Sequence, residues 1–194
     1  PICLDGNKDP LTVLQGFENY AANRQGAKLF MIYQQDNLLN AVEQRIRQSE
    51  TLRRSVSLVG YIPHEELGSW YSAADFFISA SYKEGSGYAL LEAIACGCFP
   101  VVSNIPAFRK ITANGNVGML FKKGNPGELT TALEKSRLLQ NDLAREYIKQ
   151  HFENNFSFRK IAEEFTVICR QFKNEVHTPE PARTNPEPAY RYQS

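Results

Sequence analysis

Short apolar runs alternate with amphipathic segments along most of this chain, and this alternation constrains its fold more than any other feature. The runs that we interpret as strands cover residues 2–4, 28–33, 56–59, 76–79, 100–103 and 118–121. Strands that are apolar throughout are typical of a parallel sheet covered on both faces. We therefore predict a doubly wound, Rossmann-like α/β domain of about six strands with helices on both faces. Such sheets bind ligands beyond the carboxyl ends of their strands.

Helix signals lie between these runs. Asp9 followed by Pro10 is typical of a helix start, because an acidic N-cap and a proline at the first helical position are both favoured there. We expect that helix to end at Gly26. Further helices are predicted at residues 38–49, 63–72, 88–96 and 107–111, from the Asn125–Glu128 start, and from Ser157 onward. The loops at the ligand-binding edge are then residues 5–9, 60–64, 79–87 and 103–106.

Composition and length set limits on the class of protein. The chain has 194 residues, with 22 lysines and arginines against 21 acidic residues, so nothing in the charge balance indicates a nucleic-acid partner. No apolar run approaches the ~20 residues that span a bilayer. The chain begins at Pro1 without a signal peptide, and we interpret it as a fragment whose upstream part is missing. We predict one domain over residues 1–174 and a disordered, proline-rich and glutamate-rich tail over residues 175–194.

The cysteines are scattered along the chain. They are Cys3, Cys96, Cys98 and Cys169, and their spacing matches neither a zinc site nor a disulfide framework. We therefore predict no metal site and expect reduced, buried thiols in a cytoplasmic protein.

Residues 82–100, YKEGSGYALLEAIACGCFP, form the most informative stretch. A glycine-containing loop leads into a short, nearly apolar helix that carries one acid, Glu92, with Glu84 in the loop before it. We expect the helix to bury Leu91, Ile94 and Cys98 and to project Glu92 from the flank of that stripe. An ionised carboxylate among apolar neighbours is costly unless it is paired or faces a wet crevice. The ordinary alternative is a surface acid at Glu84 and a lysine or arginine partner for Glu92.

The start of this helix suits an anion. Its first N–H groups lack intrahelical partners, so the amides of Gly87, Tyr88, Ala89 and Leu90 form a candidate phosphate cradle. The helix dipole contributes only ~0.3–1 kcal/mol, whereas micromolar binding needs ~8 kcal/mol. Side-chain cations and a further pocket must therefore contribute.

The order of elements and loops from about residue 2 to residue 172 resembles the donor-binding C-terminal domain of GT-B retaining glycosyltransferases of the group 1 type, family 4. The motif that carries the resemblance is E-x7-E, here Glu84-GSGYALL-Glu92, followed by AIACG and a strand. The Gly60 loop before an acidic helix, the Ala73-Ala74-Asp75 turn, the Asn104-Ile105-Pro106 loop and residues 118–121 also match.

The resemblance implies a nucleotide-sugar site with no metal and no cofactor. Glu84 would orient the donor hexose and stabilise charge developing at its anomeric carbon, and Glu92 would accept the ribose hydroxyls. Tyr61 and Ile62 would flank the base. The residues expected at the sugar and distal phosphate are Ser86, Gly87, Tyr88, Ala89 and Leu90.

Lys8 occupies the position at which the family has a lysine that contacts the diphosphate. Without the resemblance, the favoured interpretation is a solvated lysine before a helix cap. Cys3 occupies the position of the family's usual arginine. The loss of one charge-assisted contact, ~1.5–3 kcal/mol, would lower affinity by one to two decades. Among the other polar residues, His64, Lys83 and Arg109 are expected at the surface, and the ring of Tyr88 is expected to pack.

The implied activity is hexosyl transfer from a nucleoside diphosphate with retention of configuration. Its partners would be the nucleotide sugar and an N-terminal acceptor-binding domain of the same polypeptide, through which peripheral membrane association is conceivable. Without that domain the fragment would transfer nothing. One alternative is a non-catalytic nucleotide-sugar-binding or regulatory module of the same fold. A sugar-nucleotide epimerase or a phosphorylase would need an extra histidine or a cofactor lysine, and a signalling domain an acidic phosphoacceptor cluster; the sequence presents no clear candidate for these.

Overall fold

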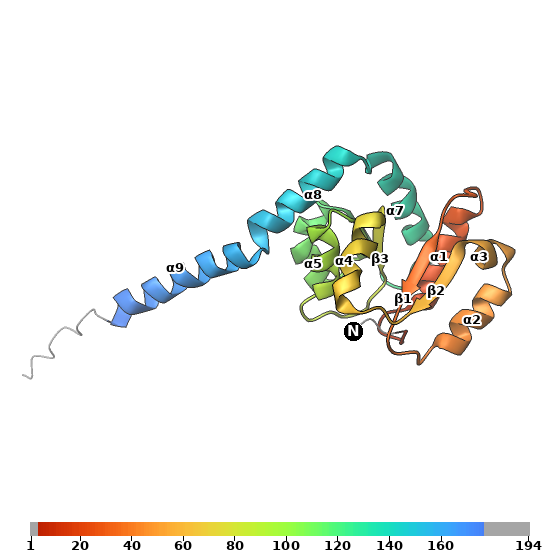
Figure 1. Ribbon diagram of the computed structural model, residues 1–194, viewed down its shortest axis with the longest axis horizontal. Coiled ribbons are helices and arrows are strands. Elements are labelled where there is room, and N and C mark those ends of the chain that lie inside the picture. Colours follow the sequence, from red (N-terminus) through yellow and green to blue (C-terminus); the bar gives the residue numbers. More distant parts are fainter. Residues whose placement is uncertain (1–3, 177–194) are drawn as a thin grey trace, which may run out of the picture. The chain divides into compact units, whose positions relative to one another are not determined.

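The computed structural model describes residues 4–176, which fall into two compact units that divide between Phe156 and Ser157. The first unit is an α/β domain (Figure 1). Its strands are β1 (Leu29–Ile32), β2 (Val56–Gly60), β3 (Phe76–Ser79), β4 (Phe99–Ser103) and β5 (Met119–Phe121). Its helices are α1 (Pro10–Ala21), α2 (Leu39–Arg47), α3 (Glu50–Ser55), α4 (His64–Ala73), α5 (Tyr88–Ala95), α6 (Pro106–Ile111), the 3-10 turn η1 (Ala113–Gly115), α7 (Pro126–Leu139) and α8 (Asp142–Asn155).

All strand pairs of this unit are parallel, which confirms the predicted fold class. Within the described residues, however, the expected sheet of about six strands is divided into a β1–β2 sheet and a β3–β4–β5 sheet. The chain segment from Leu4 to Asn7 lies between them. The Leu4 N–H donates to Gln35 O (2.8 Å) just after β1, and the Tyr82 N–H donates to Asn7 O (2.8 Å) just after β3. Residues 2 and 3 of the predicted first strand lie outside the described part.

Strand β4 and helix α5 form the centre of the second sheet. Every residue of β4 is buried, because α5 and α8 contact this strand and α7 contacts it as well. Within α5 the buried residues are Leu90, Ala93 and Ile94, so the predicted stripe is wrong at Leu91, which is only partly buried. The adjacent residues Ala93 and Ile94 are both buried because α5 packs against α4 and α8 as well as against β4.

Helix boundaries depart from the prediction in three places. Helix α1 ends at Ala21, not at Gly26, and tight turns follow it. Helices α3 and α8 were not predicted. Ser49 caps α3 by accepting the N–H of Leu52 (3.2 Å), and Asn141 caps α8 by accepting the N–H of Ala144 (2.9 Å). Both are side-chain N-caps of the ordinary kind. The starts of α3 and α8 could therefore have been predicted from the sequence.

The second unit consists of helix α9 (Phe158–Val176), which begins one residue after the expected Ser157. Its apolar side chains are exposed, at Phe158, Ile161, Phe165, Val167, Ile168 and Phe172. The helix continues through residues 175 and 176, where the tail was predicted to begin, and the rest of that tail lies outside the described residues.

Three cysteines are described, and all are free thiols. Cys98 is buried and Cys96 half-buried, whereas Cys169 is exposed, contrary to the expectation that all would be buried. From Leu4 to Val176, no helix is both long and apolar enough to cross a membrane.

Candidate functional site

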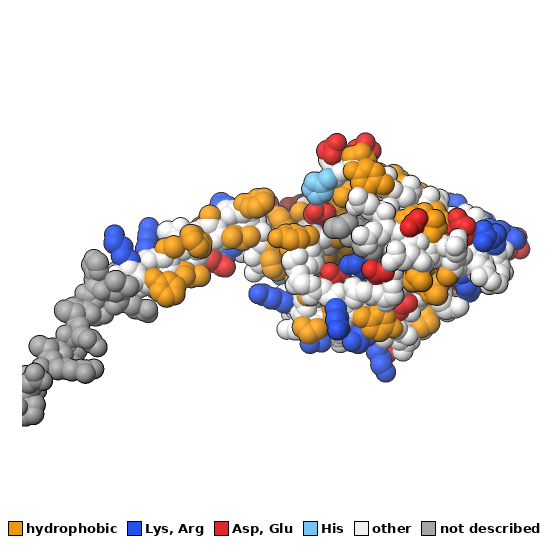
Figure 2. Space-filling view, turned by 90° about the horizontal axis from the view of Figure 1, so that it is seen from below, with side chains coloured by type: hydrophobic (Ala, Val, Ile, Leu, Met, Phe, Trp, Pro, Cys, Tyr) orange, Lys and Arg blue, Asp and Glu red, His pale blue; other side chains and the backbone are white. Residues whose placement is uncertain are grey.

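The loops that follow β1, β2, β3 and β4, with the segment before α1, lie at one edge of the sheets. Asn7 ties the first segment to the loop after β3: its side-chain amide donates to Lys83 O (3.1 Å) and its Oδ1 accepts the Lys83 N–H (3.0 Å). Figure 2 views the molecule from the lower side of Figure 1 and shows basic and acidic side chains side by side near the middle of this face. This is the edge at which doubly wound sheets bind ligands.

Lys8 and Glu84 form an ion pair across these two loops. Their side chains are 28% and 17% exposed, so neither is the solvated surface residue of the ordinary alternative. The Ser81 hydroxyl donates to the same carboxylate oxygen, Glu84 Oε1 (2.8 Å), and lies 3.0 Å from the Ser79 hydroxyl. The Glu84 carboxylate is therefore fixed by a cation and a hydroxyl, and charge-assisted hydrogen bonds of this kind are the stronger class.

Local turn chemistry places Lys8. The Lys8 N–H donates to Asp5 Oδ1 (2.9 Å), and Asp9 caps α1 by accepting the N–H of Thr12 (3.2 Å). Asp9 has φ 46°, in the left-handed region that aspartate tolerates better than most residues. The negative charge of Asp9 is also the main cause of a raised pKa at the Tyr82 hydroxyl. The sequence Asp-x-x-x-Asp before Pro10 thus builds the turn that directs Lys8 toward Glu84.

Helix α5 begins from Gly87, which has φ 66°. A Cβ at this position would lie 2.7 Å from Ile111 Cδ1, so the left-handed turn and the close approach both require glycine. The N–H groups of Leu90 and Leu91 both donate to Gly87 O (3.0 and 3.1 Å), and the Leu90 amide is therefore unavailable to a phosphate. No acceptor in the described part of the chain meets the N–H of Tyr88 or Ala89. The predicted phosphate cradle therefore has fewer available amides than expected.

The ring of Tyr88 is 71% exposed, so the expectation that it packs is wrong. The helix entrance turns this side chain outward because Gly87, immediately before it, is buried against α6. Ser86 is exposed beside it.

Glu92 lies on the side of α5 that faces α4. Its side chain is 35% exposed, and the nearest basic group is His64 Nδ1, 3.9 Å from Glu92 Oε1. Over residues 4–176 no lysine or arginine forms an ion pair with it, contrary to the ordinary alternative. Burial, and then the negative charge of Glu92, raise the pKa of the Tyr71 hydroxyl on α4. Glu92 is thus a half-exposed carboxylate beside α4, and His64 is largely exposed, as expected.

The two residues predicted to flank a base differ in exposure. Tyr61 is 65% exposed, whereas the Ile62 side chain is 8% exposed. Ile62 can therefore offer a ligand only its backbone, because its side chain is part of the core.

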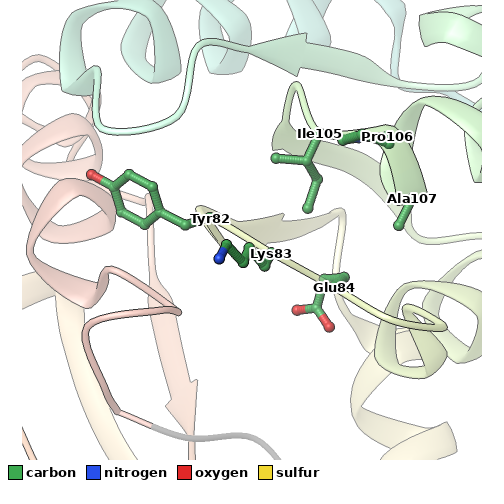
Figure 3. Close-up of a pocket in the computed structure, with 6 residues that line it drawn as sticks. All are labelled: Tyr82, Lys83, Glu84, Ile105, Pro106 and Ala107. Atoms are coloured by element: carbon green, nitrogen blue, oxygen red, sulfur yellow. The ribbon is translucent and has the colours of Figure 1, made fainter.

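A pocket of about 290 Å³ adjoins Glu84. It lies between residues 82–84 of the loop after β3 and residues 105–107 at the start of α6 (Figure 3). The walls are mostly apolar apart from Glu84 and Lys83. Lys83 and Arg109 are exposed as predicted, and Arg109 donates to Asn104 Oδ1 (2.9 Å).

Three residues of the site were missed in the sequence. Asn7 and Ser81 are short polar residues in the loops predicted to lie at the ligand-binding edge, a position that could have drawn attention to them, whereas Tyr71 is indistinguishable from any aromatic on a helix. Cys3 lies outside the described residues. In residues 4–176, no group of three or more histidine, cysteine, aspartate or glutamate side chains is placed to hold a metal ion.

Comparison with known proteins gives consistent matches. The family model "Glycosyl transferases group 1" matches residues 4–154. An uncharacterized glycosyltransferase of Methanocaldococcus jannaschii is 27% identical over 128 residues, which is 63% of this chain but only 32% of that relative. This chain thus spans about a third of the relative's length.

Two solved structures share the fold at low sequence identity. The C-terminal domain of the group 1 protein LpcC from Francisella tularensis has a TM-score of 0.66 at 22% identity, covering 77% of this chain and 78% of that one. HepE from Anabaena, in complex with UDP and glucose, has a TM-score of 0.73 at 14% identity, covering 87% of this chain and 46% of that one.

Proposed function

This chain belongs to the group 1 glycosyltransferases, and from that premise we propose that it binds a nucleoside-diphosphate sugar and presents its hexosyl group for transfer with retention of configuration. The observation that carries the proposal is the Lys8–Glu84 pair, held across two loops at the ligand-binding edge. A cation for the diphosphate thereby lies directly beside a carboxylate for the sugar.

Each part of the donor has a candidate partner. Lys8 has N–H donors beyond the one used by Glu84 and would neutralise the diphosphate without a metal. The amides of Tyr88 and Ala89 would take the distal phosphate, with Ser86 and Gly87 beside them. Glu84 would meet the hexose, Glu92 the ribose hydroxyls, and the exposed ring of Tyr61 the base. The Anabaena neighbour, solved with UDP and glucose, supports a ligand of this class.

The transfer step that we propose takes place on one face of the sugar. The bond between the anomeric carbon and the donor's phosphate oxygen breaks, and the acceptor oxygen bonds to the same carbon on the same face. The acceptor's proton passes to the departing phosphate oxygen. Glu84 stabilises the positive charge that develops at the anomeric carbon, and its fixed position means that little reorganisation is needed. The acceptor would be held by an N-terminal domain of the same polypeptide, so this chain alone would bind the donor without transferring it.

Calorimetry of this chain with a panel of nucleoside-diphosphate sugars, in the presence of EDTA, tests donor binding. We expect one donor to bind, and Lys8→Met to weaken its binding by roughly ten- to a hundredfold, because a charge-assisted contact of ~1.5–3 kcal/mol is lost. Lys28→Met is the matched control, since Lys28 lies at the amino end of β1 and donates to Arg54 O. Failure of every donor to bind, or equal losses in the two variants, would contradict the proposal. In the complete protein, donor binding without turnover would favour a non-catalytic module.

A further inference from the structure

The Tyr71 hydroxyl is a structural anomaly. Tyr71 is 7% exposed, and its hydroxyl has no hydrogen-bond partner within the described part of the chain. Buried polar groups are almost always paired, because an unpaired one has lost its water without a replacement. A phenylalanine would fill the same space without this cost. The hydroxyl therefore calls for an explanation other than packing.

The position of Tyr71 relates it to Glu92. His64 and Tyr71 are two helical turns apart, and both lie on the side of α4 that meets α5. The Tyr71 side chain packs with Ala93, the residue after Glu92, and its ring meets that of Phe77 edge-on at 6.1 Å. The negative charge of Glu92 and a side-chain interaction with its carboxylate both contribute to the raised pKa of Tyr71, so the hydroxyl lies near this carboxylate, although it makes no hydrogen bond of ordinary geometry with any described residue. It stays protonated and can act as a donor.

We propose that Tyr71 is a positioning residue that fixes the Glu92 carboxylate when a ribose is bound. This inference rests on the proposed function, in which Glu92 accepts the ribose hydroxyls. A carboxylate has about four acceptor sites on its two oxygens, enough for two ribose hydroxyls and one protein donor. Glu92 is half-exposed and His64 Nδ1 lies 3.9 Å away, so within residues 4–176 no hydrogen bond of ordinary length fixes its carboxylate. The Tyr71 hydroxyl gains its missing partner when the ribose draws the carboxylate into line.

The consequence is selectivity for ribonucleotides over 2′-deoxyribonucleotides. Pairing of the Tyr71 hydroxyl contributes to affinity only when both ribose hydroxyls hold Glu92 in place. A ligand without the 2′-hydroxyl leaves the carboxylate free to turn away and the hydroxyl unpaired.

The test uses Tyr71→Phe and measures both thermal unfolding and affinity. We expect the Tm to be unchanged or higher, because an unpaired buried hydroxyl is removed. The Kd for UDP or GDP, whichever the wild type binds, should rise about tenfold, and that for its 2′-deoxy counterpart should change less than threefold. In a Glu92→Gln background, Tyr71→Phe should cause no further loss, since it acts through Glu92. Tyr20→Phe is the matched control, because Tyr20 is equally buried, at 7% exposure, on α1.

Different failures have different meanings. If the wild type binds neither nucleotide, the proposed function fails and this inference fails with it. If the wild type binds one and Tyr71→Phe binds both sugar forms as the wild type does, only the role of Tyr71 is overturned. A lower Tm with unchanged selectivity would show that the hydroxyl is structural.

Discussion

Glu84 and Glu92 stand at the two ends of one short turn-and-helix segment, yet their surroundings differ. Glu84 is held by Lys8 and Ser81 before any ligand arrives. Glu92 is half-exposed, with His64 at 3.9 Å and the neighbouring Tyr71 hydroxyl, which has no hydrogen-bond partner among residues 4–176. The E-x7-E spacing therefore does not make the two carboxylates equivalent.

The difference suits the two tasks that we propose. A group that stabilises charge in a transition state works best when it is already in place, because reorganisation then adds nothing to the barrier. A group that recognises a ribose can be completed by the ligand, and specificity follows from what the wrong ligand leaves unpaired. In this proposal the sugar end of the site is preorganised, and ligand binding orders the nucleoside end.

Exchanging each glutamate for glutamine should give the largest difference between the two carboxylates. In the complete enzyme, Glu84→Gln should lower turnover roughly 10²–10³-fold, as expected when a preorganised electrostatic group is lost. It should also lower the free energy of unfolding by about 2 kcal/mol, because Lys8 is left partly buried without its partner. Glu92→Gln should change stability by less than about 0.5 kcal/mol.

Glu18→Gln serves as the control for this pair of variants. Arg45 on α2 and Glu18 on α1 form an ion pair with side chains 27% and 20% exposed, close to the values for Lys8 and Glu84. Chemical denaturation should show a similar loss of stability, with donor affinity unchanged. Equal destabilisation by Glu84→Gln and Glu92→Gln would show that the two ends are held alike.

Gly87→Ala tests whether the start of α5, between the two glutamates, has a fixed conformation. A side chain at φ 66° is strained, and its Cβ would press on Ile111, so the variant should lose about 1.5 kcal/mol of stability. Gly85→Ala is the matched control, since no atom lies within 4 Å of its added Cβ. Thermal unfolding should separate the two variants. If both behaved like the wild type, the helix entrance would not be fixed as described.

A pH titration gives the smallest expected effect and probes the Glu92 end. Burial and the charge of Glu92 hold the pKa of Tyr71 above 10.0, its ordinary value in the unfolded chain. The folded protein then retains a proton that the unfolded chain releases, so this contribution to stability is intact below pH 10 and declines as the pH rises. Relative to Tyr71→Phe, the wild type should lose about 0.8 kcal/mol between pH 8 and pH 10.5. Parallel pH profiles in urea denaturation would indicate a solvated hydroxyl.

Much of this molecule could be predicted from local patterns, and the remainder could not. Apolar runs gave the strands to within one or two residues, and the caps at Asp9 and Asn125 gave helix starts, because both signals depend on neighbouring residues. The division into two sheets could not be predicted, since it depends on how a segment at the start of the chain pairs with distant loops. The Lys8–Glu84 contact likewise joins residues far apart in the sequence, and the unpaired hydroxyl of Tyr71 among the described residues depends on how α4 packs against α5.

The clasp between Asn7 and Lys83 joins residues 76 positions apart. Closing so long a loop carries an entropic cost before its contacts are gained, so we expect this clasp to form after the elements between its ends. A nascent chain would then acquire this edge of the sheets late, and any slow step in the intervening residues would delay it as well.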